Sequence, residues 1–77
     1  MLFRSEEAFE DAIEDRDVVV RALRGLVPRQ RAAIVLTGLF EYSSEEAGEL
    51  LGIDPATVRT LGSRARASMR KTVGDLG

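Results

Sequence analysis

The chain has 77 residues, of which 44% are hydrophobic and 31% are charged, so we expect one small soluble globular domain. It contains no cysteine and no histidine, which excludes a disulfide framework and removes the usual ligands of a metal site and the usual bases of an active site. The net charge of −2 argues weakly against a nucleic-acid partner, but the charges are unevenly distributed.

The charge distribution divides the chain into two parts. Residues 1–17 contain seven acidic and two basic residues, whereas residues 18–77 contain nine basic and six acidic ones. This asymmetry predicts an acidic linker or first helix over 1–17, followed by a DNA-facing domain over 18–77. No apolar run approaches the ~20 residues of a membrane span, and the N-terminus lacks the form of a signal peptide. We therefore expect a cytoplasmic protein with no membrane partner.

The first half of the chain predicts two or three helices. Residues 5–26 have a helical apolar pattern that does not decide between one helix and two, and Gly25 near its end suits a C-terminal stop. Pro28 is typical of the first position of a helix, where its missing N–H costs nothing. The apolar face of that next helix extends to Phe40, and Gly38 is expected to weaken its last turn.

A short helix follows these segments. Ser43 and Glu46 have the S-x-x-E spacing of a capping box, in which each residue satisfies a backbone N–H of the other. The helix they start is expected to end at Gly52. Between residues 43 and 54 the sequence has four acidic residues and no basic one.

A basic helix completes the chain. It is expected to start at Asp54 or Pro55 and to run to about Val73, where Gly74 stops it. It carries five basic residues and no acidic one: Arg59, Arg64, Arg66, Arg70 and Lys71. A short helix, a tight turn and a basic helix are the layout of a helix-turn-helix, which presents its second helix to a polyanion.

Together these segments predict an all-α fold, a small domain of four to five helices with a C-terminal helix-turn-helix. No segment alternates with period two over a useful length, so no strand is assigned. The predicted core comprises Ile34, Val35, Leu39, Leu50, Leu51, Ile53, Val58, Ala65 and Met69.

The stretch Leu23–Arg70 resembles region 4 of bacterial sigma-70-type factors, specifically those of the extracytoplasmic-function (ECF) group. The matching segments are ALRGLVPRQRAAIVL, then YSSEEAGELLGIDPATVRT, then SRARASMR. None of these segments is specific alone, but their order and spacing are those of the family.

The resemblance implies a DNA-binding domain that recognises the −35 element of double-stranded promoter DNA and docks on the flap of RNA polymerase. An anti-sigma factor is a further candidate partner, and no cofactor is expected. No enzymatic activity is expected either, since no nucleophile–base set can be assembled without histidine or cysteine. Carried over by position, the residues that contact bases are Arg59, Thr60, Ser63 and Arg64. The residues that contact the DNA backbone are Arg31, Ser44 and Thr57.

Helical spacing supports the same face for base contact. On a helix that starts at residue 55, positions 56, 59, 60, 63 and 64 share one face near the N-terminal half, which is the part that enters a major groove. Arg59 and Arg64 each match the O6/N7 edge of guanine, a contact worth roughly 1–3 kcal/mol of discrimination. Arg66 and Arg70 lie further along the helix, and we expect them to contact phosphates or to be solvated.

Three positions depart from the family's commonest residues. Leu61 stands where a basic residue is frequent, Gly62 where a large aliphatic residue is frequent, and Ala47-Gly48 where Ile-Ala is more usual. The glycines predict a thinner, less rigid helix-turn-helix or a closer approach of its helices.

These departures motivate a second hypothesis, a protein-interaction module with weak DNA reading. Its partner would be the polymerase flap, an anti-sigma factor or an activator, bound by a surface that includes Leu61, Phe40 or Tyr42. The DNA-binding domain of LuxR-type regulators is a third alternative because it shares the helix-turn-helix. The R-A-R at residues 64–66 and the step from Pro28 to Arg31 favour the sigma factor over that alternative.

Overall fold

The computed structural model describes residues 16–76, and the helix start predicted near residue 5 lies outside them. The described residues form α2 (Arg16–Arg24), α3 (Pro28–Ile34), the π-helical segment η1 (Val35–Leu39), α4 (Ser44–Leu51) and α5 (Pro55–Leu76). No strand occurs between residues 16 and 76, and the all-α fold with a C-terminal helix-turn-helix is confirmed. No helix within these residues is long and apolar enough to cross a membrane.

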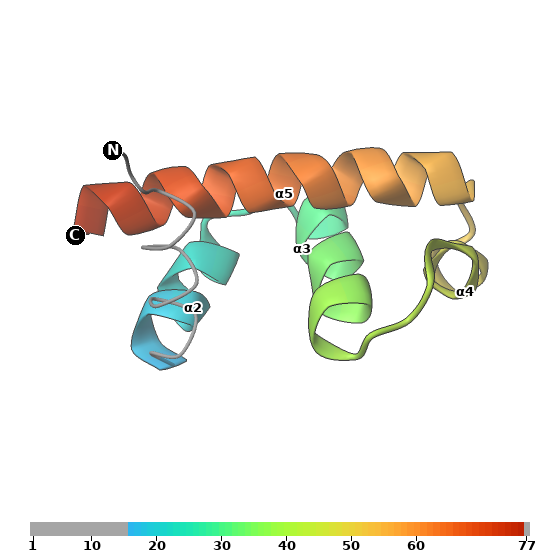
Figure 1. Ribbon diagram of the computed structural model, residues 1–77, viewed down its shortest axis with the longest axis horizontal. Coiled ribbons are helices and arrows are strands. Elements are labelled where there is room, and N and C mark those ends of the chain that lie inside the picture. Colours follow the sequence, from blue (N-terminus) through green and yellow to red (C-terminus); the bar gives the residue numbers. More distant parts are fainter. Residues whose placement is uncertain (1–15, 77) are drawn as a thin grey trace, which may run out of the picture.

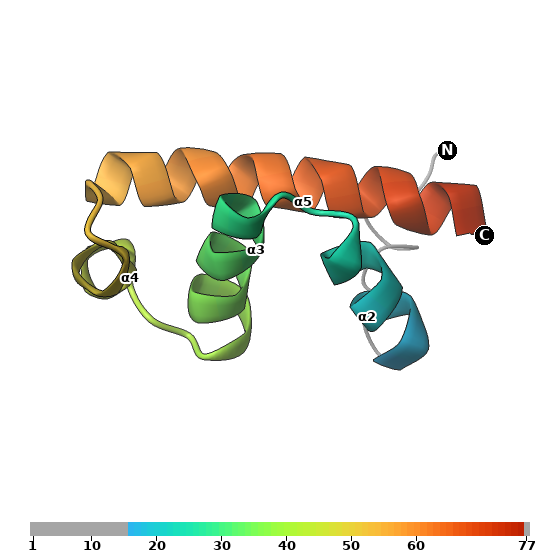
Figure 2. The same ribbon diagram turned by 180° about the vertical axis from the view of Figure 1, so that it is seen from behind.

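The 22-residue helix α5 is the element against which the rest of the domain packs. At 1.5 Å per residue it is roughly 33 Å long. Helix α4 lies at its N-terminal end, α3 against its middle and α2 toward its C-terminal end (Figures 1 and 2), and all three contact it. One side of α5 is therefore covered by the other helices that the structure describes.

The core forms two clusters along α5, both of which contain small side chains. The first consists of Ala22, Leu26, Ala65 and Met69, and the second of Ala33, Ala47 and Val58. Alanines at these positions let the helices approach closely. Burial of Val58, Ala65 and Met69 was predicted and is confirmed.

The predicted burial of two residues is wrong, because Leu39 and Leu50 are 58% and 63% exposed. Leu39 lies in the π-helical segment, where each turn holds more residues and later side chains are rotated away from the expected face. Helix α4 buries Ala47 and Gly48 and leaves Leu50 in solvent. Leu61, named above as part of a possible partner-binding surface, instead packs half-buried against the second cluster.

The last turn of the α3–η1 helix, which Gly38 was expected to weaken, is π-helical. The N–H of Phe40 donates to the carbonyl of Val35 at 3.1 Å, and the N–H of Tyr42 donates to the carbonyl of Leu36 at 2.9 Å. Glu41 then takes a left-handed backbone conformation with φ 60°, which is uncommon for a residue with a side chain. This ending turns the chain toward α4.

The predicted boundaries of the helix-turn-helix are confirmed at three points. The Ser43 hydroxyl accepts from the N–H of Glu46 at 3.0 Å, and the Glu46 carboxylate accepts from the N–H of Ser43 at 2.8 Å, which completes the capping box. Gly52 ends α4 in a left-handed conformation with φ 73°, and Pro55 is the first residue of α5. The stop predicted at Gly74 is wrong, because α5 continues to Leu76. A glycine in helical conformation costs only about 1 kcal/mol, which does not compel a helix to end.

Arg31 connects α3 to the end of α2. Its Nε donates to the carbonyl of Leu23 at 2.9 Å, and its Nη2 donates to the carbonyl of Leu26 at 2.8 Å. The last carbonyls of a helix have no partner within that helix, and a cation there also complements the helix dipole. The guanidinium of Arg31 therefore fixes the turn between α2 and α3.

We expect Arg31→Lys to lower the free energy of unfolding by about 2 kcal/mol, because a lysine ammonium does not reproduce the planar two-pronged contact of arginine with both carbonyls. Urea unfolding followed by circular dichroism measures the change, with Arg29→Lys on the exposed side of α3 as the control. Equal stability of the two variants would contradict the bridging role of Arg31.

Candidate nucleic-acid interface

The residues predicted to contact bases lie together on the side of α5 that faces away from α2, α3 and α4. Arg59, Thr60, Ser63 and Arg64 are all exposed, as is Ala56 beside them. Their helical positions are opposite those of Val58, Ala65 and Met69, which pack into the core. The small side chains between the two arginines allow another molecule to approach the helix closely. We call the surface formed by Arg59, Thr60, Ser63 and Arg64 the α5 face.

A hollow of about 200 Å³ adjoins the α5 face. Its lining comprises Ile34, Thr37, Ser44, Val58, Arg59, Gly62, Ser63 and Arg66. Among residues 16–76 no acidic residue belongs to this lining, which combines two arginines with three hydroxyl-bearing residues. We call it the Gly62 hollow. It brings Ser44, at the first position of α4, next to the basic side of α5.

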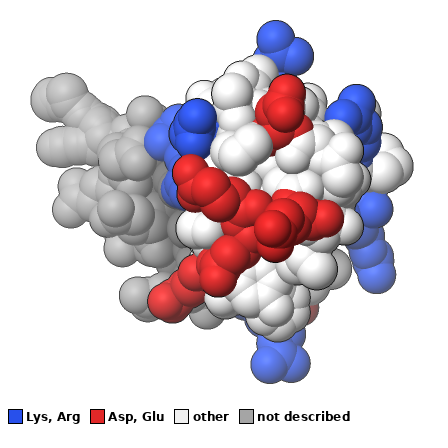
Figure 3. Space-filling view, turned by 90° about the vertical axis from the view of Figure 1, so that its right-hand side faces the viewer, with Lys and Arg blue, Asp and Glu red and all other residues white. Residues whose placement is uncertain are grey.

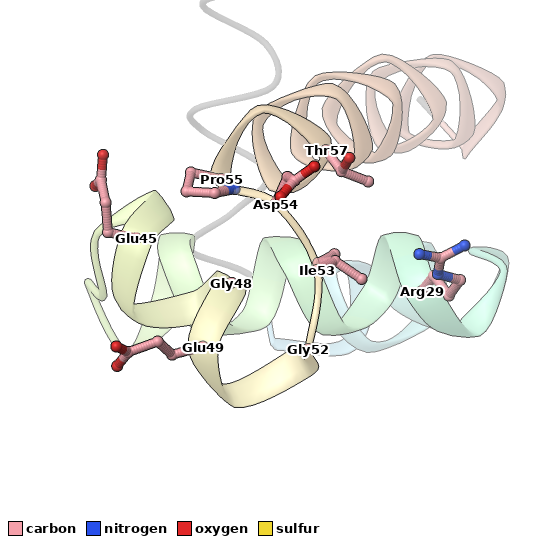
Figure 4. A pocket seen from close by; sticks show the side chains of 9 residues that line it. All are labelled: Arg29, Glu45, Gly48, Glu49, Gly52, Ile53, Asp54, Pro55 and Thr57. Carbon is pink, nitrogen blue, oxygen red and sulfur yellow. The ribbon is translucent and has the colours of Figure 1, made fainter.

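A second hollow, of about 660 Å³, lies between α4 and the start of α5 and has the opposite charge. Its lining includes Glu45, Glu49 and Asp54, with Arg29 and Thr57 at the edge toward α3 (Figure 4). Acidic side chains form a continuous band across this end of the molecule (Figure 3). A polyanion is therefore attracted to the Gly62 hollow and the α5 face and repelled from this acidic hollow.

The structure places the five residues predicted to contact phosphates in different surroundings. Ser44 and Arg66 lie in the Gly62 hollow beside the α5 face. Thr57 lines the acidic hollow, and Arg31 directs two of its donors to carbonyls of its own chain. Arg70 is half-buried, and its Nε atom is buried. The phosphate contacts of all five residues stay predictions from the sequence.

Two glycines have roles that the sequence did not distinguish. A Cβ at Gly48 would lie 2.6 Å from the carbonyl oxygen of Ile53, so this glycine allows the closer approach that was one of the two expectations for it. A Cβ at Gly62 would meet nothing within 4 Å, so this glycine opens space instead of closing it. The only signal for the hollow was the absence of the expected aliphatic side chain at position 62.

Residues 16–69 match the family described as Sigma-70, region 4. The chain belongs to this family. The match covers both core clusters up to Met69 and the whole helix-turn-helix apart from the C-terminal end of α5. It decides between the sigma factor and the LuxR-type alternative in favour of the sigma factor.

Curated relatives agree with the family match. The chain is 35% identical over 69 residues to the RNA polymerase sigma-E factor of Streptomyces coelicolor, an alignment that covers 86% of this chain and 39% of that protein. It is 36% identical over 64 residues to the ECF RNA polymerase sigma factor SigM of Mycobacterium tuberculosis, covering 83% of this chain and 33% of that protein.

The chain thus spans between a third and two fifths of the length of these relatives. No solved structure matches it. The family and the relatives together identify the chain as a region 4 domain of an ECF sigma-70 factor, as the resemblance implied.

Proposed function

We propose that this region 4 domain reads the −35 element of promoter DNA and docks on RNA polymerase, so that it acts in transcription initiation by binding rather than by catalysis. Its relatives are named as RNA polymerase sigma factors, which supports the polymerase as a partner. The observation that carries the DNA-reading part is the α5 face, where four side chains suited to base contact lie exposed together.

In the proposed complex α5 enters the major groove with its N-terminal half. Arg59 and Arg64 reach guanine edges, while Thr60 and Ser63 lie close to the bases between them. Ser44 and Arg66 contact the backbone on the side of the Gly62 hollow. The acidic hollow stays outside the interface, because bringing its three carboxylates near phosphates would be unfavourable.

Selection from a pool of randomised short duplexes at low salt tests this function. We expect the domain to retain duplexes that share a motif, with affinity that falls steeply as salt is raised. Salt-dependent retention without any shared motif would reduce the function to backbone binding. Failure to retain any duplex would contradict DNA reading by this domain.

A second candidate function, a protein-interaction module with weak DNA reading, is favoured by one surface. Leu39 and Phe40 are 58% and 63% exposed, and the rings of Phe40 and Tyr42 lie 6.3 Å apart between centroids. Exposed apolar groups gathered at one loop are typical of interaction sites. We propose the polymerase flap as the first partner to test there and an anti-sigma factor as the second. Flap binding that is lost in Phe40→Ser, by a domain that retains no duplex motif in the selection above, would support this function over DNA reading.

A further inference from the structure

The Gly62 hollow exists because α5 has no side chain at position 62. A Cβ there would have no heavy atom within 4 Å, although the residue is half-buried and its neighbours Val58 and Ile34 line the same space. A large aliphatic side chain at this position would extend into the hollow and cover its apolar floor. The glycine therefore leaves an opening at this position of α5.

The polar groups of the hollow are donors suited to an anion. Arg59 and Arg66 contribute guanidinium groups from α5, and Ser44 and Ser63 contribute hydroxyls from α4 and α5. The hydroxyl of Thr37 donates to the carbonyl of Ala33 at 2.7 Å, so we do not count it among the donors.

Two carboxylates near the start of α4 are directed away from this hollow. Glu46 accepts from the N–H of Ser43 in the capping box, and Glu45 lines the acidic hollow. Neither belongs to the lining of the Gly62 hollow. An anion in this hollow would therefore meet donors from two helices without an acidic residue in the same lining.

Size and position select the kind of anion. A water molecule occupies about 30 Å³ in the liquid, so a hollow of about 200 Å³ has room for a phosphate group and some of its hydration. The hollow shares Arg59 and Ser63 with the α5 face, which places an anion in it directly beside the bases that α5 would contact. A backbone phosphate at the edge of a major groove has this position relative to the bases.

We propose that the Gly62 hollow seats one backbone phosphate of the bound duplex, held jointly by Ser44 of α4 and Arg66 of α5. The proposal rests on the proposed function, since it assigns a contact within the same DNA complex. It makes Gly62 a positioning residue, because the missing side chain lets the phosphodiester backbone come within reach of both α4 and α5. The phosphate would thereby set the register of α5 in the groove.

Substitution of Gly62 by leucine tests the proposal. Gly62→Leu fills the hollow, and Gly74→Leu makes the same change where a Cβ also meets nothing within 4 Å but outside the hollow. We expect Gly62→Leu to bind the selected duplex more weakly. We also expect its affinity to depend less steeply on salt: the negative slope of log affinity against log salt should shrink in magnitude by about 0.9, the value for one phosphate. We expect Gly74→Leu to match the unchanged chain. Thermal unfolding by circular dichroism establishes that both variants are folded.

A methylphosphonate scan, in which each backbone phosphate is made neutral in turn, locates the contact. One position should weaken binding of the unchanged chain but not of Gly62→Leu, and Ser44→Ala should show a reduced loss at that same position. Ser44→Ala leaves the hollow open and the Ser43 cap intact, so it keeps the test valid if leucine at position 62 disturbs the fold.

The outcomes separate the phosphate seat from the proposed function. Equal affinity and an equal salt slope for Gly62→Leu, or the same methylphosphonate profile in all variants, would overturn the seat while DNA reading stands. Failure of the unchanged chain to bind any duplex would overturn the function and the seat with it.

Discussion

Gly48→Ala is expected to lower the free energy of unfolding by about 2 kcal/mol, although alanine is the better helix former. The new Cβ would lie 2.6 Å from the carbonyl oxygen of Ile53 and 3.4 Å from the nitrogen of Pro55. Both atoms belong to the backbone of the turn between α4 and α5, so the clash moves the turn and not a flexible side chain. Overpacking of this kind typically costs about 1–3 kcal/mol, more than the gain in helix propensity where backbone must move.

Urea unfolding followed by far-UV circular dichroism measures this loss, and Gly62→Ala is the matched control. It makes the same chemical change in a helix but places the Cβ in open space, so we expect it to raise stability by about 0.5–1 kcal/mol. Opposite signs for the two variants would show that tertiary contact decides the effect. Stabilisation by both would refute the close approach at Gly48.

Arg64→Ala is expected to reduce discrimination between the selected duplex and a scrambled one by about 1–3 kcal/mol, with Arg59→Ala giving a similar loss. The reason is that a guanidinium forked on a guanine edge is a base contact and not only a charge contact. Fluorescence anisotropy titrations of both duplexes at one salt concentration measure the change. The selected duplex should lose much more affinity than the scrambled one.

One lysine variant and one arginine variant control for the loss of positive charge. Lys71→Ala, on the exposed C-terminal part of α5, should weaken both duplexes alike if it has any effect. Arg24→Ala removes the same charge from the end of α2 and should change neither strongly. If Arg64→Ala weakened both duplexes equally, the α5 face would be a phosphate contact and not a base reader.

Local signals in the sequence determined the helices of the second half of the domain. The spacing of Ser43 and Glu46 predicts the capping box, Gly52 the end of α4, and Pro55 the start of α5. Each of these depends on groups within a few residues, such as a hydroxyl beside an unsatisfied N–H or a glycine at a positive φ. The family resemblance rests on the same local segments, and the match over residues 16–69 confirms it.

The composition of the core was predicted less well, because apolar periodicity does not show how closely two helices approach. It overestimated the burial of Leu39 and Leu50 and passed over the alanines at positions 22, 33 and 47, which the structure buries. A small side chain carries little hydrophobic signal, yet it is what a tight helix crossing requires.

The residues of the α5 face follow from the sequence alone, since helical spacing places positions 59, 60, 63 and 64 on one side of any regular helix. Only the tertiary structure decided what lies beside that face. It placed Ser44 with Arg66, placed Thr57 among carboxylates, and directed Arg31 to the end of α2. It also gave Gly48 and Gly62 opposite roles. The physical reason is that a glycine's effect depends on the atoms that would surround a Cβ, and those atoms come from distant parts of the chain.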